Sequence, residues 1–474
     1  MFIGTFYFDI PSTFPSLGMT SIFYIGFVFV VFVLARTYRS FLRPIVLLMA
    51  NIVFLWSFSN YDLIAIFVLA ILGYLFGIII DKYKDIKVLA TCITFYIAVL
   101  TLFKYSSFFN FDNLIMPLGL SFYSFKIISY LFDIHKQKCE IEKNILYYLD
   151  YVMFFPTIMA GPINRAKPFF DAIKTKTEFD YVDAKSGAFQ MLLGIFEKKV
   201  FCDYIGILVN NILANEALFG TNVLLAVVLY SFQIYLDFDA LSNIAIGTAR
   251  LLGFRIPKNF NSPYVASNLN DFWRRWHISL SSWFRDYLYI PLGGNRKGTI
   301  RRYINLIIVF VVSGIWHGST WNFILWGLLH GIIQTIEMLV MKPFKGKEVH
   351  KTLKPLLKVS GVIINFTIVT FLWLIFKCQT MNEVIVIIER ILTAQAFDYQ
   401  LVGMTINEVY WLSFIIIAVI IIDILRDRCD AIELFNRQHF LVRWTTYAIL
   451  LVMFIVFGVY GGSFSASDFI YQFF

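Results

Sequence analysis

The chain has 474 residues, of which 59% are hydrophobic and only 15% are charged. A soluble protein of this length carries about 25% charged residues, and the charges here stand in short clusters between apolar runs of membrane-spanning length. A soluble multidomain protein is therefore excluded. The net charge of +9 does not indicate a nucleic-acid partner, because the basic residues flank the apolar runs and suit contact with membrane lipid.

The apolar runs predict an all-α polytopic membrane protein, with about 11 transmembrane helices and additional re-entrant segments. We expect a single membrane domain over residues 1–474, because no linker or internal repeat divides the chain. The expected spans are 20–35, 44–58, 62–80, 87–103, 115–133, 147–160, 186–213, 221–253 (broken), 303–340 (broken), 356–376, 409–425 and 443–460.

Loop charges predict the orientation of the chain. Arg36, Arg39 and Arg43 follow the first apolar run, whereas the segment before that run contains no Lys or Arg. Lys and Arg concentrate in cytoplasmic loops, so the N-terminus is expected on the outer side. The Lys-rich stretch 342–358 is then cytoplasmic, and one last span leads the tail, residues 461–474, back to the outer side.

Two polar, Trp-rich stretches interrupt this apolar chain. The stretch Phe272–Gly298 contains His277, and the stretch Val311–Gly331 contains His317. A polar group inside a bilayer costs several kcal/mol unless it lines a protein cavity, so such stretches are candidate functional sites. Residues 255–302 also contain three prolines and a Gly-Gly pair, which predicts a re-entrant or interfacial segment beside the site.

Metal chemistry has no support in the residue spacing. The five cysteines form no CxxC pair, and the six histidines form no HxxxH or HExxH motif. We therefore expect neither a metal site nor a disulfide framework.

The runs WRRWHISLSSWFRDYLYIPLGGNRKG and SGIWHG resemble the membrane-bound O-acyltransferase (MBOAT) family, specifically its bacterial branch for polysaccharide O-acetylation. The resemblance is strongest over about 156–331, the expected catalytic core, and implies helices arranged around a central funnel. It also implies that His317 is the catalytic histidine. A neutral imidazole can take the proton of an acceptor hydroxyl as that hydroxyl attacks a thioester. The alternative is a structural histidine that is hydrogen-bonded between helices.

The resemblance assigns further candidates on the first polar stretch. His277 matches the family's second polar position, where it can orient the acyl group, donate to the oxyanion or support the fold. Arg274, Arg275 and Trp276 are candidates for binding the acyl donor, because guanidinium groups suit the phosphates of coenzyme A. The alternative for the two arginines is anchoring at the cytoplasmic face. Arg285 is expected to shape the cytoplasmic mouth.

The chain ends in DFIYQFF, which has the form Phe-x-Tyr-x-x-Phe. This ending resembles the aromatic C-terminal motif of the family's acyl-transfer systems, which implies that Tyr471 relays the acyl group to another protein. An aromatic anchor at the membrane interface is the alternative.

Together these features imply an acetyltransferase in a bacterial inner membrane, with both termini periplasmic. It would take acetyl from cytosolic acetyl-CoA and pass it to a separate periplasmic SGNH-type O-acetyltransferase. A composition rich in Phe, Ile, Lys and Asn favours peptidoglycan as the final acceptor. Alternatives are O-acetylation of alginate or another exopolysaccharide, and D-alanylation of teichoic acid. A non-catalytic polysaccharide flippase is an alternative of another class, which predicts inverted repeats and charges along several spans.

Overall fold

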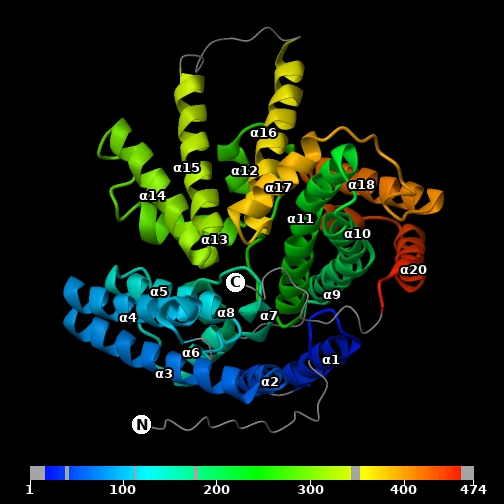
Figure 1. The fold of residues 1–474 in the computed structure, drawn as a ribbon. Coiled ribbons are helices and arrows are strands. Elements are labelled where there is room, and N and C mark those ends of the chain that lie inside the picture. The colour runs from blue at the N-terminus through cyan, green and yellow to red at the C-terminus, as the bar shows by residue number, and fades with distance from the viewer. Residues whose placement is uncertain (1–16, 38–41, 112–113, 176–179, 343–352, 461–474) are drawn as a thin grey trace.

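The computed structural model describes residues 17–37, 42–111, 114–175, 180–342 and 353–460, and every regular element in these ranges is a helix (Figure 1). The elements are α1 (Ile22–Thr37), α2 (Arg43–Trp56), α3 (Asn60–Tyr83), α4 (Ile86–Lys104), η1 (Ser106–Phe109), α5 (Leu120–His135), α6 (Ile145–Met153), α7 (Phe155–Ile158), α8 (Ala166–Lys174), α9 (Tyr181–Phe196), η2 (Glu197–Cys202), α10 (Asp203–Ala214), α11 (Gly220–Leu251), η3 (Pro263–Val265), α12 (Leu269–Arg275), α13 (Ile278–Phe284), η4 (Arg285–Tyr289), α14 (Thr299–His317), α15 (Trp321–Met341), α16 (Leu353–Lys377), α17 (Met381–Leu392), α18 (Ile406–Arg426), α19 (Ala431–Asn436) and α20 (Phe440–Phe457).

Eight of the described helices are long and apolar enough to cross a membrane. They are α3, α4, α11, α14, α15, α16, α18 and α20. Two shorter apolar helices, Ile22–Ala35 and Arg43–Trp56, precede them. The prediction of an all-α polytopic membrane protein is thus confirmed.

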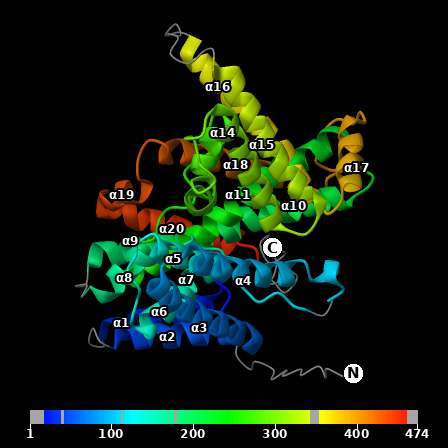
Figure 2. The ribbon, with the colours of Figure 1, turned by 90° about the vertical axis from the view of Figure 1, so that its left-hand side faces the viewer.

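The helices pack around two hydrophobic cores. Helices α1 to α8 form one layer, at the bottom of Figures 1 and 2. Helices α10 to α18 lie largely above this layer. Two tryptophans from the second half of the chain cross into the first core. The ring of Phe125 on α5 stacks on Trp283 at 4.0 Å and on Trp316 at 5.2 Å between centroids. These contacts seat both polar stretches against the N-terminal layer.

One predicted break in the helices is wrong. The run 221–253 was expected to be broken, but α11 is a continuous helix of 32 residues. Its acids are paired by neighbouring helices: Asp237 lies 2.7 Å from the ammonium of Lys198, and Asp239 lies 2.5 Å from the guanidinium of Arg426. Buried charges that are paired in this way do not need a helix break to reach water.

The other predicted break is present. The run 303–340 divides into α14 and α15, which are separated by residues 318–320. Within 255–302, residues 255–298 contain only short helices, among them α12 and α13 with seven residues each, and α14 begins at Thr299. Seven helical residues cover about 10 Å, which is too short to cross a bilayer core of about 30 Å. The irregular segment therefore lies beside the longer helices, as the prolines and glycines predicted.

Candidate active site

His317 is the last residue of α14 and is only 5% exposed. Its Nδ1 atom lies 2.6 Å from the backbone carbonyl oxygen of Ser313, one helical turn earlier. A carbonyl oxygen can only accept a hydrogen bond, so Nδ1 carries the proton of the neutral ring and donates it. The lone pair of the imidazole then lies on Nε2, which is the tautomer that a general base requires.

The helices α14 and α15 approach each other closely at glycines. A Cβ atom on Gly314 would lie 2.3 Å from the carbonyl oxygen of Phe323, and one on Gly327 would lie 2.2 Å from that of Phe310. Both obstacles are backbone atoms, so a side chain at either glycine would force the helices apart. Small residues allow such close helix packing in membranes, and here they fix the helical hairpin that carries His317.

Aromatic rings surround the imidazole of His317. The rings of Trp316, Trp326 and Phe376 meet it nearly edge to face, with centroids 4.7, 5.0 and 5.4 Å away. Such a lining excludes water from the imidazole and lowers the local dielectric. Charges that develop during a reaction interact more strongly in such a site than in water.

His277 occupies a different structural setting, a sharp corner between α12 and α13. Its backbone is left-handed, with φ 43° and ψ 53°, a conformation that is uncommon outside glycine and often marks functional sites. Asn259 holds the corner: its carbonyl accepts from the amide of Ile278 at 2.8 Å, and its side chain accepts from the hydroxyl of Ser279, also at 2.8 Å. Burial lowers the pKa of His277 to about 4, so its ring is neutral at pH 7.

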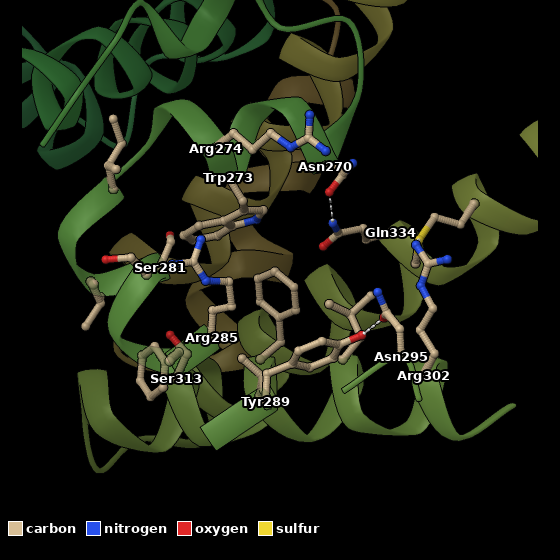
Figure 3. A pocket seen from close by; sticks show the side chains of 18 residues that line it. Asn270, Trp273, Arg274, Ser281, Arg285, Tyr289, Asn295, Arg302, Ser313 and Gln334 are labelled. Carbon is tan, nitrogen blue, oxygen red and sulfur yellow. Dashed lines mark hydrogen bonds between the residues drawn. The ribbon is translucent and has the colours of Figure 1, made fainter. Parts of the chain in front are cut away.

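A cavity of about 540 Å³ lies between α12, α13, η4, α14 and α15 (Figure 3). Three exposed arginines line it, namely Arg274, Arg285 and Arg302, together with the buried Ser313. Arg302 and Ser313 lie 11 residues apart on α14, or about 16 Å along the helix axis. Ser313 is also the residue whose carbonyl holds His317. The lining of the cavity therefore extends along α14 from Arg302 to within one helical turn of the buried imidazole.

The structure separates the three candidates for donor binding. Arg274 lines the cavity. Arg275 is not among the lining residues; its guanidinium pairs with Asp271 at 3.0 Å and with Asp427 at 2.5 Å. Trp276 also lies outside the lining, within the second hydrophobic core. Tyr471, the proposed acyl carrier, is outside the described residues.

Two residues at the site were missed by the sequence analysis. Arg302 was assigned to no site, although it lines the cavity. His330 on α15 is fully buried, and the indole Nε1 of Trp273 donates to its Nδ1 atom at 3.3 Å. The ring of Trp326 lies against both His330, at 4.8 Å, and His317. An ionisable residue within a predicted span, here in the same polar stretch as His317, was the available signal.

Comparisons with known proteins agree with this geometry. The family model for the membrane-bound O-acyltransferase family, MBOAT, matches residues 50–385. The chain is 34% identical over 303 residues to the probable alginate O-acetylase AlgI of Pseudomonas aeruginosa, covering 60% of this chain and 56% of the relative. It is 33% identical over 340 residues to the peptidoglycan O-acetyltransferase of Helicobacter pylori, covering 62% of each chain.

A third relative is the teichoic acid D-alanyltransferase of Bacillus subtilis, which is 31% identical over 237 residues, covering 47% of this chain and 59% of the relative. The matches thus span less than two thirds of the length of these curated relatives. The family model nevertheless covers well over half of the chain, including both polar stretches and all three arginines of the cavity. The chain belongs to the membrane-bound O-acyltransferase family.

Proposed function

We propose that this protein transfers an acetyl group from cytosolic acetyl-CoA across the inner membrane for O-acetylation of a cell-envelope polysaccharide. One observation carries the proposal: Ser313 both lines the cavity and holds Nδ1 of His317. A donor bound in the cavity would therefore bring its reactive end within one helical turn of His317, whose ring has the tautomer that base catalysis requires.

The basic mouth of the cavity suits coenzyme A. Guanidinium groups bind phosphates with paired hydrogen bonds, and Arg274, Arg285 and Arg302 lie where the nucleotide end of the donor would enter. Exposed Arg296, Lys297 and other basic residues adjoin α14, and such clusters favour the cytoplasmic side. The thioester would then point inward, toward Ser313.

The proposed chemistry is one acyl transfer. His317 Nε2 takes the proton of the acceptor hydroxyl as its oxygen attacks the thioester carbonyl carbon. The new C–O bond forms, the C–S bond breaks, and the coenzyme A thiolate takes the proton back from the imidazolium. His277 is proposed to support this step, since its buried ring sits at a left-handed corner directly before Ile278, which lines the cavity.

We propose Tyr471 as the first acceptor and a periplasmic SGNH-type O-acetyltransferase as the partner that receives the acetyl group from it. An acetyl ester of a phenol remains reactive, because a phenolate leaves more readily than a sugar alkoxide. Tyr471→Phe keeps the aromatic ring and removes the hydroxyl, so envelope acetylation should be lost. Full acetylation in this variant would mean that the acetyl group passes to the partner without this residue.

Peptidoglycan is the acceptor that we favour over alginate. The composition rich in Phe, Ile, Lys and Asn supports this choice, whereas the alignments with the Helicobacter pylori and Pseudomonas aeruginosa relatives cover nearly equal shares of the chain, 62% and 60%, at nearly equal identity. Analysis of O-acetyl groups on purified muramic acid and on exopolysaccharide, with and without the gene, distinguishes the two acceptors.

The proposed orientation is tested by labelling. On an otherwise cysteine-free chain, a cysteine at position 463 should react with an impermeant reagent in cells with a permeabilised outer membrane, and one at position 350 should not. The reverse pattern would invert the proposed topology.

Acetyl transfer itself is tested with purified protein in lipid nanodiscs and acetyl-CoA labelled in the acetyl group. The acyltransferase proposal predicts release of free coenzyme A and transfer of label to protein or partner. A flippase would release no coenzyme A, and that result would overturn the proposal.

A further inference from the structure

The helix that carries His317 ends among three buried residues, Trp316, His317 and Gly318, which lie between the exposed Ile315 and Ser319. The last four carbonyl groups of any α-helix have no partner within the helix, and a buried helix end needs donors from elsewhere. In α14 these carbonyls include those of Gly314, Ile315 and Trp316, directly beside the imidazole. The Gly318 amide reaches only the first of them, at 3.4 Å.

The missing donors come from the far end of α4, more than 200 positions earlier in the chain. The ammonium of Lys104 donates to the carbonyl oxygen of Trp316 and also lies 5.2 Å from the centre of the Trp316 ring. The hydroxyl of Tyr105 lies 2.8 Å from the carbonyl oxygen of Ile315 and 3.1 Å from that of Gly318. One hydroxyl proton serves both oxygens, so this side chain bridges the end of α14 and the break that follows it.

The direction of the Lys104 side chain is informative. A lysine at the end of an apolar helix ordinarily extends its charge toward the membrane surface. Here the charge points to a helix C-terminus, where a cation is favoured by the helix dipole, and to an aromatic face, where it is favoured by the ring electrons. Lys87, at the opposite end of the same helix, is exposed instead.

We infer that Lys104 and Tyr105 are positioning residues that hold the last turn of α14, and thereby His317, in its reactive geometry. The Nδ1 bond to Ser313 spans one turn, so it forms only while that turn stays helical. Loss of the anchors would let the turn fray and let the imidazole rotate away from the carbonyl of Ser313 that fixes its tautomer. The catalytic part of this inference rests on the proposed role of His317, whereas the structural part does not.

The test compares Lys104→Met and Tyr105→Phe with Lys87→Met, which removes a lysine from the same helix without touching α14. Coenzyme A release from acetyl-CoA is measured in membrane vesicles that retain the native envelope partners. Lys104→Met should lower kcat about 10- to 100-fold, the cost of displacing a catalytic group by about 1 Å. KM should not change, because neither residue lines the cavity. Tyr105→Phe removes a single oxygen and should lower kcat by less.

Hydrogen–deuterium exchange separates this inference from the proposed function. Amides at 314–318 should exchange faster in Lys104→Met and Tyr105→Phe than in Lys87→Met, while those at 303–308 stay unchanged. Tyr105→Phe removes only one oxygen. If this variant kept both the amide exchange rates and the kcat of the wild type, the inference would be overturned. If His317→Ala kept full activity, the proposed base would be wrong, yet the exchange result would still report on the anchor.

Discussion

His317 and His277 are the same residue type at similar depth in the protein, but their surroundings prepare them differently. His317 ends a regular helix, its Nδ1 atom is fixed by a carbonyl, and its ring is enclosed by aromatic side chains. His277 sits in a left-handed corner, and its Nδ1 atom has no hydrogen-bond partner among the described residues. The ring of His317 is therefore fixed in a single tautomer by a hydrogen bond, whereas the position of His277 is fixed by its backbone conformation.

This difference separates two ways of building a site. The position of His317 depends on helix packing, so changes at the interface of α14 and α15 should affect it. The position of His277 depends on a turn whose geometry is held by Asn259. Substitutions at the two histidines should accordingly differ both in the size of their effect and in whether they alter folding.

The largest effect is expected for His317→Ala. Removal of a general base costs about 100- to 10,000-fold in rate, so O-acetyl groups on the envelope should fall to background. The amount of protein in the membrane should stay normal. The side chains of Lys104 and Tyr105 donate to backbone carbonyls at the end of α14, and the substitution removes none of these groups. Base-released acetate measures the first, and an immunoblot measures the second. Normal acetylation would remove His317 from the mechanism.

A smaller but broad effect is expected for Gly327→Ala. The added Cβ would lie 2.2 Å from the carbonyl oxygen of Phe310, and such overpacking costs about 1–3 kcal/mol. Both the melting temperature and the acetylation level should fall. The control is Gly26→Ala on α1, where a Cβ meets nothing within 4 Å. An unchanged melting temperature in Gly327→Ala would show that the two helices are not fixed by this contact.

A pair of substitutions at His277 separates its ring from its backbone. Asn tolerates the left-handed conformation, whereas Ala is strained there. His277→Asn should fold normally and lose about 10-fold in activity, and His277→Ala should also give less protein. Wild-type activity in His277→Asn would assign this histidine to the fold alone.

The smallest effects are expected at the mouth of the cavity. Arg285→Gln and Arg302→Gln should each raise KM for acetyl-CoA a few-fold and leave kcat unchanged, because exposed charge pairs contribute about 0.2–1 kcal/mol. Added salt should also raise the KM of the wild type for acetyl-CoA, because salt screens the exposed charges. Arg428→Gln, an exposed arginine outside the cavity, is the matched control. If the variant that carries both Arg285→Gln and Arg302→Gln kept the wild-type KM for acetyl-CoA, the donor would bind elsewhere.

Hydropathy was sufficient to predict much of the fold. The expected span 87–103 is found as α4, Ile86–Lys104, and the break within 303–340 is present. The predicted break in α11 was wrong for a physical reason. Asp237 and Asp239 are buried in this continuous helix, and their partners Lys198 and Arg426 come from distant segments that local hydropathy does not reveal.

The site shows the same limit at the scale of single residues. Polarity within an apolar chain marked the stretches around both histidines, and the structure places Arg274 in the lining of the cavity. Its neighbour Arg275 is not part of this lining, because successive helical residues point about 100° apart. Lys104 could not be found from sequence, since its contact with Trp316 joins positions 212 residues apart.

We propose that an acetyl group from the cytoplasmic side reaches its acceptor with His317 as the base. This proposal is tested most directly in sealed inside-out vesicles, which expose the cytoplasmic face to added acetyl-CoA labelled in the acetyl group. Wild-type vesicles should accumulate alkali-labile label on lumenal acceptors. Vesicles with His317→Ala at the same protein level should accumulate none. Equal lumenal label in both preparations would contradict it.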